Sequence, residues 1–305
     1  MAKQREVNPR NDVFPAGTLW NRVQRTTARA LQSGAMQPID TEATYFSDRG
    51  IQFLIRVISR LRDKPPPDED HNPFLPCEEA LYVANALDSH LCVLNKYNVV
   101  DHHLLIVTRE FQHQEAQLTQ RDFHALWRCM REYESLGFYN SGTRSGASQR
   151  HKHLQLIPSA PGWDTNGHPV TLSSKLDAVT SPVGRVTRVD GLPFHHAFVR
   201  RDIDDARDVA GVAIDTLFHY REMMCYVGID LPESIDALVA TPYNLLVSKR
   251  WMLLVPRARE CFRGISLNAL AFVGAFLVQD RKQLAQLLEA GPLTALRTVA
   301  FPRAE

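Results

Sequence analysis

The sequence predicts an α+β fold with antiparallel sheets, and three observations support this fold class. Predicted strands and helices are mixed along the chain without the regular βαβ alternation of a parallel sheet. Two pairs of apolar segments, within 90–108 and 243–256, are each split by a short polar stretch, as in a β-hairpin. The chain has 305 residues and is 44% hydrophobic, which suffices for one large domain or two fused halves.

In the first half, a helix, a strand, a loop and a hairpin follow one another. The apolar residues of 17–32 fall roughly on one helical face, and the β-branched segment 50–59 predicts a strand. The proline-rich, acidic segment 62–79 predicts a loop. Strands at 90–97 and 102–108 then form the first predicted hairpin.

A second helix is predicted over 118–136, followed by a loop. Thr119 is its expected N-cap, Asp122 lies at the third helical position, and Gly137 ends it. The glycine- and serine-rich segment 138–149 predicts a loop. The later elements predicted in the same way are a strand at 193–200, a helix at 205–224, hairpin strands at 243–248 and 251–256, a buried apolar segment at 268–279 and an amphipathic helix at 281–290.

Composition and charge argue against several classes of protein. Lys and Arg number 35 against 34 Asp and Glu, so the chain lacks the basic excess that favours nucleic-acid binding. Five scattered cysteines without a CxxC pair indicate reduced thiols and no zinc framework. The polar N-terminal segment does not resemble a signal peptide, and no apolar run approaches the length of a membrane span. We therefore expect a soluble, cytoplasmic protein.

The stretch SGASQRHKHLQLIP at 145–158 holds the most informative pattern in the chain. A strand is predicted over 151–157, and side chains two apart on a strand share a face, so His151, His153 and Gln155 point the same way. The opposite face, which can lie against the core, carries Lys152, Leu154 and Leu156. Three polar side chains in a row need polar partners, so their face is expected to open onto a polar ligand.

The small-residue loop before the strand suggests that this ligand is an anion. Gly142 and 145–148 allow backbone N–H groups to approach a phosphate closely, and Ser148 and Gln149 add side-chain donors. A neutral histidine beside such a loop can attack phosphorus with one ring nitrogen while the other donates to a fixed acceptor. That acceptor is expected to be His151 or its backbone carbonyl.

Gln155 indicates which type of reaction the site favours. The Gln155 amide can donate to a phosphate oxygen but neither supplies nor accepts a proton, which favours group transfer over hydrolysis. Two other interpretations of the HxH pair remain open at this point. It could ligate a metal together with other histidines, or both histidines could be structural.

Six segments of the chain, in order, resemble segments of the ATP adenylyltransferases, also called diadenosine tetraphosphate phosphorylases. The central one is SGASQ-x-HKHLQ, and the six are 34–39, 72–81, 94–111, 138–158, 243–257 and 266–278. This family is part of the histidine-triad superfamily, in the branch of galactose-1-phosphate uridylyltransferase. The resemblance implies a histidine-triad-like antiparallel sheet flanked by helices. It places the HxHxQ motif in a catalytic region at 1–192 and an additional C-terminal α/β half at 193–305.

The resemblance also implies a reaction, in which diadenosine tetraphosphate (Ap4A) plus phosphate gives ATP plus ADP, reversibly. The second histidine of the motif, His153, would attack an α-phosphorus and hold AMP as a phosphoramidate. Gln155 would hold the non-bridging oxygens, and His151 completes the catalytic set. The expected partners are a dinucleoside polyphosphate, ATP, ADP and phosphate, with no nucleic acid and no membrane. No cofactor is expected other than Mg2+ accompanying the polyphosphate, and the protein is expected to be a monomer or weak homodimer.

Further residues match family positions that bind substrate. In the first half these are Lys64, Asn95, Lys96, Asn140, Gly146, Ala147, Ser148 and Gln149. In the second half the candidates for phosphate or nucleoside contacts are Asn244, Lys249 and Arg257. For the lysines and the arginine the alternative is a solvated surface charge.

Some positions depart from the family pattern or resist assignment. Arg150 and Asp101 are such departures, and their roles stay open. The adjacent His102 and His103 face opposite ways if they lie on a strand, so at most one of them lines a given site. Neither is placed in the catalytic set.

Four alternatives compete with Ap4A phosphorolysis. A transferase using ADP and sulfate is one, and a uridylyltransferase using a UDP-sugar is another. HKH in place of HPH and the absence of paired cysteines argue against the uridylyltransferase. Gln155 argues against a hydrolase, and the intact His153 and Gln155 argue against a non-catalytic nucleotide-binding protein.

Overall fold

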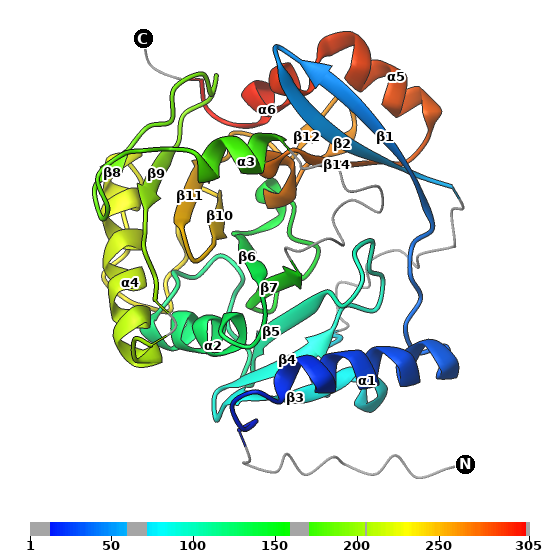
Figure 1. The fold of residues 1–305 in the computed structure, drawn as a ribbon, viewed down its shortest axis with the longest axis vertical. Coiled ribbons are helices and arrows are strands. Elements are labelled where there is room, and N and C mark those ends of the chain that lie inside the picture. The colour runs from blue at the N-terminus through cyan, green and yellow to red at the C-terminus, as the bar shows by residue number, and fades with distance from the viewer. Residues whose placement is uncertain (1–12, 60–71, 159–170, 205, 303–305) are drawn as a thin grey trace.

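The computed structural model describes residues 13–59, 72–158, 171–204 and 206–302, and it has the expected α+β architecture (Figure 1). Its strands are β1 (Thr41–Asp48), β2 (Ile51–Ile58), β3 (Tyr82–Leu87), β4 (His90–Leu94), β5 (Leu104–Thr108), β6 (Ser135–Asn140), β7 (His153–Pro158), β8 (Val186–Thr187), β9 (Ala197–Arg200), β10 (Tyr243–Val247), β11 (Trp251–Pro256), β12 (Cys261–Phe262), β13 (Ile265–Ser266) and β14 (Ala275–Val278). Its helices are α1 (Leu19–Ser33), α2 (Gln120–Met130), α3 (Thr171–Asp177), α4 (Val209–Tyr226), α5 (Arg281–Ala290) and α6 (Pro292–Val299). Short 3-10 turns are η1 (Glu79–Leu81), η2 (Thr143–Ser145) and η3 (Ala269–Val273).

A nine-stranded antiparallel sheet with the order β3-β4-β5-β7-β6-β10-β11-β9-β8 forms the centre of the molecule. It is continuous across both halves of the sequence, because β6 pairs with β10 in register from Asn140–Asn244 to Gly137–Val247. A three-stranded sheet, β1-β2-β14, joins the two halves a second time. The predicted catalytic region at 1–192 and the predicted C-terminal half at 193–305 therefore share their sheets. The boundary at 192 stays a prediction.

Helices cover one face of the large sheet. α1 packs on β3, α2 on β3, β6 and β7, and α4 on α2 and β9. Leu154 and Leu156 of β7 belong to the apolar cluster on this face. The opposite face includes Phe138 and Ile157, and its C-terminal part is covered by η3, α5, α6 and the β1-β2-β14 sheet, which lie together at the top of Figure 1. Because strand side chains alternate, the polar side chains of β7 point away from α1, α2 and α4.

The second helix begins where predicted and ends earlier than predicted. Thr119 and Asp122 form a reciprocal capping box, with the Thr119 N–H donating to the Asp122 carboxylate at 2.7 Å. The helix ends at Met130, and Gly137 lies inside β6. The predictions that Gly137 ends the helix and that 138–149 is wholly loop were therefore wrong. β6 is buried on both faces, and its apolar run resembles that of a buried helix.

Gly137 lies under α2, where a side chain has no room. A Cβ atom at this position would lie 2.9 Å from Leu126 Cδ1 and 3.3 Å from the Met130 sulfur. We expect Gly137→Ala to lower the free energy of unfolding by about 1–3 kcal/mol, measured by urea denaturation with tryptophan fluorescence. Gly211→Ala in α4 is the matched control, because its Cβ meets nothing closer than 3.8 Å and alanine favours a helix. Equal losses in both variants would contradict the packing argument.

Both predicted hairpins are present, as β4–β5 and β10–β11. The sequence did not indicate β1, β3 or α6. β1 has largely polar, partly exposed side chains and is a strand because it pairs with β2 along its whole length. β3, YVANAL, is rich in alanine, which is depleted in strands. No helix in the described part of the chain is both long and apolar enough to cross a lipid bilayer.

Candidate active site

Strand β7 presents the predicted histidine and glutamine on the face that points away from α1, α2 and α4. His153 and Gln155 are its first and third residues, and His151 precedes it in an isolated bridge to His113. The Phe74 ring contacts the rings of His151 and His153, with centroid separations of 5.6 and 5.5 Å. The side chains of all three motif residues are buried. The two histidine rings therefore meet one aromatic side chain, as neighbours on one face do.

His153 is held as a neutral imidazole with a defined tautomer. Its Nδ1 lies 2.8 Å from the backbone carbonyl of His151, and because a carbonyl only accepts, Nδ1 carries the hydrogen. The acceptor is thus the His151 backbone and not its ring. Burial lowers the pKa of His153 to about 4, so the ring is neutral at pH 7 and Nε2 carries a lone pair. This is the form of histidine that can act as a nucleophile.

The buried position of His153 should be visible in its titration. We expect the imidazole to stay largely neutral down to about pH 5, one unit above its lowered pKa of about 4, because protonation would place a charge where water has little access. Ring nitrogen and carbon shifts of isotopically labelled histidine measure this, with His153→Ala identifying the signal. A midpoint at or above 6.5, the ordinary pKa of histidine, would contradict the environment described.

A second chain of hydrogen bonds fixes the ring of His151. The Thr108 carbonyl only accepts, so His151 Nε2, 2.8 Å away, carries the ring hydrogen and Nδ1 is an acceptor. Nδ1 lies 3.0 Å from Asn72 Nδ2, which donates to it, and 3.3 Å from Asn72 Oδ1, which accepts the Phe74 N–H at 3.0 Å. Burial also lowers the pKa of His151. With its ring engaged at both nitrogens, His151 serves the site through its backbone carbonyl.

Lys152 lies on the opposite face of β7 and is buried against α2. Its ammonium group contacts the Asp122 carboxylate at 3.0 Å and donates to the Gln117 carbonyl at 2.7 Å. His90 Nε2 lies 3.1 Å from the other Asp122 oxygen. The lysine inside HKH is therefore an internal ion-pair partner that ties the histidine strand to the N-terminus of α2.

Gln155 is engaged by a histidine that sequence reasoning left outside the site. His103 Nε2 lies 3.0 Å from Gln155 Oε1, and His103 Nδ1 lies 3.1 Å from Asn95 Nδ2. His102 points the other way, with Nδ1 3.0 Å from Thr27 Oγ1. The expectation that at most one of the pair lines the site agrees with this arrangement. Asn95 contacts the ring of His103, and its expected contact with substrate stays a prediction.

The loop before β7 is folded on itself more tightly than expected. The N–H groups of Ser145, Gly146 and Ala147 donate to carbonyls of Gly142 and Thr143 within the loop. These N–H groups are engaged within the loop, and the expected substrate contacts of Gly146 and Ala147 stay a prediction. Among the described residues, the N–H groups of Ser148 and Gln149 make no hydrogen bond and can receive an anion.

Two glycines allow this loop to turn. Gly142 and Gly146 have φ of +82° and +88°, in the region that favours glycine. A Cβ atom at Gly146 would lie 2.9 Å from the Leu267 carbonyl oxygen. The loop is therefore pressed against the segment that precedes η3.

Arg257 and Asn244 support the loop from the C-terminal half. Arg257 is fully buried and donates to Asn244 Oδ1 at 2.5 Å, while Asn244 Nδ2 donates to Asn140 Oδ1 at 2.8 Å and to the Ser145 carbonyl at 2.9 Å. The remaining Arg257 donors go to the backbone carbonyls of Ser145, Leu267, Val299, Arg259 and Glu260. Both side chains thus support the loop, and their contact with substrate stays a prediction. The Asn140 NH2 group makes no hydrogen bond to the described residues and can face a ligand.

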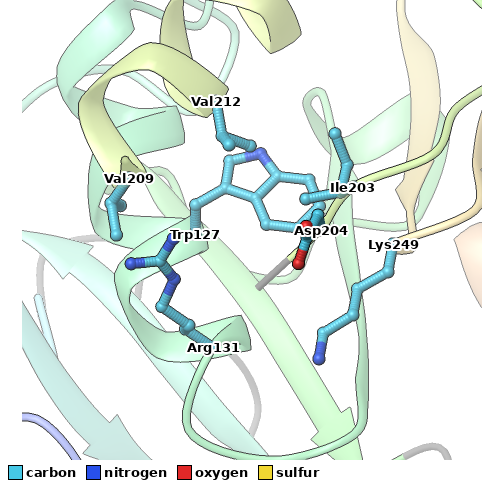
Figure 2. Close-up of a pocket in the computed structure, with 7 residues that line it drawn as sticks. All are labelled: Trp127, Arg131, Ile203, Asp204, Val209, Val212 and Lys249. Carbon is cyan, nitrogen blue, oxygen red and sulfur yellow. The ribbon is translucent and has the colours of Figure 1, made fainter. Parts of the chain in front are cut away.

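Of the three predicted lysines, the two that the structure describes each form an ion pair with a glutamate. Lys96 forms a half-exposed ion pair with Glu78 at 2.8 Å, and it follows Asn95. Lys249 pairs with Glu134 at 2.9 Å, beyond the end of β10 opposite to Asn244. Figure 2 shows Lys249 beside Asp204 in the lining of a pocket that includes no residue of the histidine strand. Lys64 lies outside the described residues.

Gln114 is a further residue that sequence reasoning missed. Its Oε1 accepts a hydrogen bond from the backbone N–H of His153 at 2.8 Å. Its Nε2 donates to the backbone carbonyls of Asn140 and His153 at 2.8 and 3.2 Å. It thereby fixes the end of β6 against the start of β7. Nothing in the local pattern QHQEAQ marks this glutamine over its neighbours. In the part of the chain that the structure describes, no group of three or more His, Cys, Asp or Glu side chains is placed to hold a metal ion.

Comparison with known proteins relates both halves to characterised domains. The Ap4A phosphorylase N-terminal domain matches residues 9–175, and the ATP adenylyltransferase C-terminal domain matches residues 190–302. Two Saccharomyces cerevisiae proteins are each 27% identical to this chain. Diadenosine 5',5'''-P1,P4-tetraphosphate phosphorylase 2 aligns over 269 residues, 78% of this chain and 79% of that protein. Protein APA1 aligns over 296 residues, 85% and 86% of the respective lengths.

Solved structures show the same fold. Yeast Ap4A phosphorylase Apa2 in complex with AMP superimposes with a TM-score of 0.77 at 22% identity, covering 96% of this chain and 99% of that one. The same protein in complex with Ap4A gives a TM-score of 0.76 at 22% identity, over 94% and 98%. The resemblance seen in six segments of the sequence therefore extends over the whole architecture.

Proposed function

Because the chain belongs to the Ap4A phosphorylase family, whose N-terminal domain matches residues 9–175, we propose that it catalyses Ap4A + phosphate = ATP + ADP, reversibly, through an AMP–His153 intermediate. The chain is a nucleotidyltransferase of this family. The observation that carries the proposal is the neutral His153, whose Nδ1–H is fixed on a backbone carbonyl so that Nε2 holds the lone pair. Such a ring can attack without first losing a proton.

The first displacement forms a phosphorus–nitrogen bond. His153 Nε2 attacks an α-phosphorus of Ap4A, the bond from that phosphorus to the bridging oxygen breaks, and ATP leaves with the electron pair. The imidazole becomes a cationic phosphoramidate, whose charge the His151 carbonyl stabilises through Nδ1–H. Polyphosphate is a stable anion, so its departure needs no proton donor, and none of the groups that contact His153 supplies one.

The second displacement returns the histidine to its starting state. An oxygen of inorganic phosphate attacks the adenylyl phosphorus, the phosphorus–nitrogen bond breaks, and ADP forms. In both steps Gln155 donates to a non-bridging oxygen of the transferred phosphoryl group, where negative charge builds up. The N–H groups of Ser148 and Gln149 and the Asn140 NH2 group are proposed to receive the polyphosphate. Mg2+ bound by the polyphosphate's own oxygens belongs to the proposal as a companion of the substrate.

Phosphate dependence tests the proposal directly. Incubation with Ap4A and no phosphate should release at most one ATP per protein and leave one AMP on His153, found by mass spectrometry of the labelled peptide. Added phosphate should release that AMP as ADP and restore turnover. Continuous release of AMP without phosphate would show hydrolysis instead. Absence of both ATP and adduct would contradict the proposed function.

A further inference from the structure

We propose that His103 is a positioning residue that fixes the Gln155 amide with its NH2 group turned towards the transferred phosphoryl group. The inference rests on the proposed function for its consequence in catalysis, but the orientation of the amide can be read from the structure alone. Gln155 can stabilise negative charge only through its NH2 group, since its carbonyl oxygen would repel a phosphate oxygen. Which end of the amide faces the ligand is therefore decisive.

A chain of hydrogen bonds that starts at the backbone sets this orientation. The Tyr97 N–H can only donate, and it donates to Asn95 Oδ1 at 3.1 Å. The other end of the same amide, Asn95 Nδ2, therefore faces His103 Nδ1 at 3.1 Å and donates to it. His103 Nδ1 is then the acceptor, so the ring hydrogen lies on Nε2.

His103 in turn sets the orientation of the Gln155 amide. His103 Nε2–H lies 3.0 Å from Gln155 Oε1 and donates to it. The carbonyl end of Gln155 is thereby occupied, and its NH2 group is the end that remains for a ligand. Reversing the glutamine would set two N–H groups against each other inside a buried site. Turning the Gln155 amide over would thus require every hydrogen bond back to the Tyr97 N–H to change.

The surroundings hold this chain rigidly. His103 and Gln155 are each 9% exposed, and the His103 ring lies against Phe138 with centroids 5.7 Å apart. The Asn95 N–H also donates to the His103 backbone carbonyl at 2.9 Å, which fixes the two residues across the β4–β5 hairpin. Burial lowers the pKa of His103 to about 4, so the ring keeps the single hydrogen that the chain requires at pH 7. The other titratable ring facing it is His153, which is also neutral.

A double-mutant cycle tests whether His103 acts through Gln155. The measured quantity is the single-turnover rate of His153 adenylylation by Ap4A without phosphate. Removing one donor to a developing oxyanion costs roughly 100- to 1000-fold, so we expect Gln155→Leu to lose that much and His103→Leu to lose about 10- to 100-fold. The double variant should be no slower than Gln155→Leu alone, because His103 then has nothing left to position. Losses that multiply in the double variant would overturn the inference.

Two further variants separate positioning from folding. His103→Gln keeps an N–H donor near Gln155 and should recover most of the rate that His103→Leu loses, whereas a rate no better than that of His103→Leu would overturn the inference. His102→Asn is the matched control, since His102 has φ of +59°, which asparagine tolerates, and contacts Thr27 and Trp20 instead. It should leave the rate unchanged.

The tautomer of His103 can be measured without any substrate. Nitrogen-15 shifts of labelled full-length protein should show Nε2 protonated and Nδ1 bare, with His103→Leu identifying the signal. The opposite tautomer would overturn the inference whatever the activity. If the expected tautomer is found but wild-type protein releases no ATP from Ap4A, the proposed function fails while the hydrogen-bond chain stands. If ATP is released and His103→Leu changes nothing, the inference alone fails.

Discussion

Replacing His153 with alanine is expected to slow Ap4A phosphorolysis by roughly 10,000- to 1,000,000-fold, the range seen when a nucleophile is removed from an enzyme that forms a covalent intermediate. The reason is specific to this site. His153 Nε2 is the nitrogen left with a lone pair by the hydrogen bond to the His151 carbonyl. Direct attack of inorganic phosphate on Ap4A is expected to be slow because two anions repel each other, whereas in the adenylylated enzyme the cationic imidazole offsets part of that repulsion.

The measurement is ATP release from Ap4A by chromatography, with mass spectrometry for the adenylyl adduct. His219→Ala is the control, because His219 lies on α4 with Nδ1 2.8 Å from the Asp215 carbonyl and touches none of the site residues. We expect this control to keep full activity and the His153 variant to show neither burst nor adduct. Normal turnover in His153→Ala would mean that phosphate attacks Ap4A directly or that another group is the nucleophile.

Replacing Lys152 with methionine is expected to lower the free energy of unfolding by about 3–5 kcal/mol. Methionine fills a similar volume but leaves the Asp122 carboxylate buried without its cationic partner, and an unpaired buried charge is strongly destabilising. Urea denaturation at pH 7 gives the difference. Removing the charge as well, in Lys152→Met with Asp122→Asn, should recover much of the loss. Arg263→Met is the control, since the Arg263–Glu289 pair is exposed and should be worth less than about 1 kcal/mol.

The same ion pair predicts a dependence on pH. Lys152 holds the pKa of Asp122 well below its usual range, against the effect of burial, and His90 and Thr119 add hydrogen bonds to the carboxylate. A depressed pKa contributes stability that is fully present above the unfolded pKa of about 3.9 and is lost as pH falls below it. We therefore expect wild-type stability to fall more steeply below about pH 4 than that of the double variant lacking both charges. Parallel curves would contradict the role of Asp122.

The catalytic face of β7 could be predicted from the sequence because it depends on local periodicity alone. Residues two apart on a strand share a face, and small residues before the strand allow a tight loop. The same alternation predicted that Lys152 points to the other face. It did not predict the partner Asp122, because no local pattern relates Lys152 to a helix 30 positions earlier. Periodicity therefore predicts which way a side chain points but not which residues it contacts.

His103 and Arg257 make contacts that local periodicity could not predict. His103 reaches Gln155 because β5 pairs with β7 in the register Leu105–Gln155, and such long-range pairing cannot be read from either strand. For Arg257 the sequence offered a phosphate or nucleoside contact or a surface charge, and neither alternative includes its hydrogen bonds to buried backbone carbonyls. Its burial among backbone carbonyls depends on η3 and α6 folding over it. In the loop at 142–149, the sequence did not indicate that the N–H groups of Ser145, Gly146 and Ala147 donate to carbonyls of the same loop.

The β6–β10 pairing matters when the two halves of the chain are produced as separate fragments. A fragment of residues 1–192 made alone would present β6 as a bare edge strand, with a row of unpaired backbone groups that can recruit further copies and aggregate. It would also lack the guanidinium that braces the Ser145 carbonyl. Co-expression of the two fragments supplies each edge with its complement. We therefore expect a fragment of residues 1–192 to aggregate when it is produced alone and to stay in solution when it is co-expressed with residues 193–305.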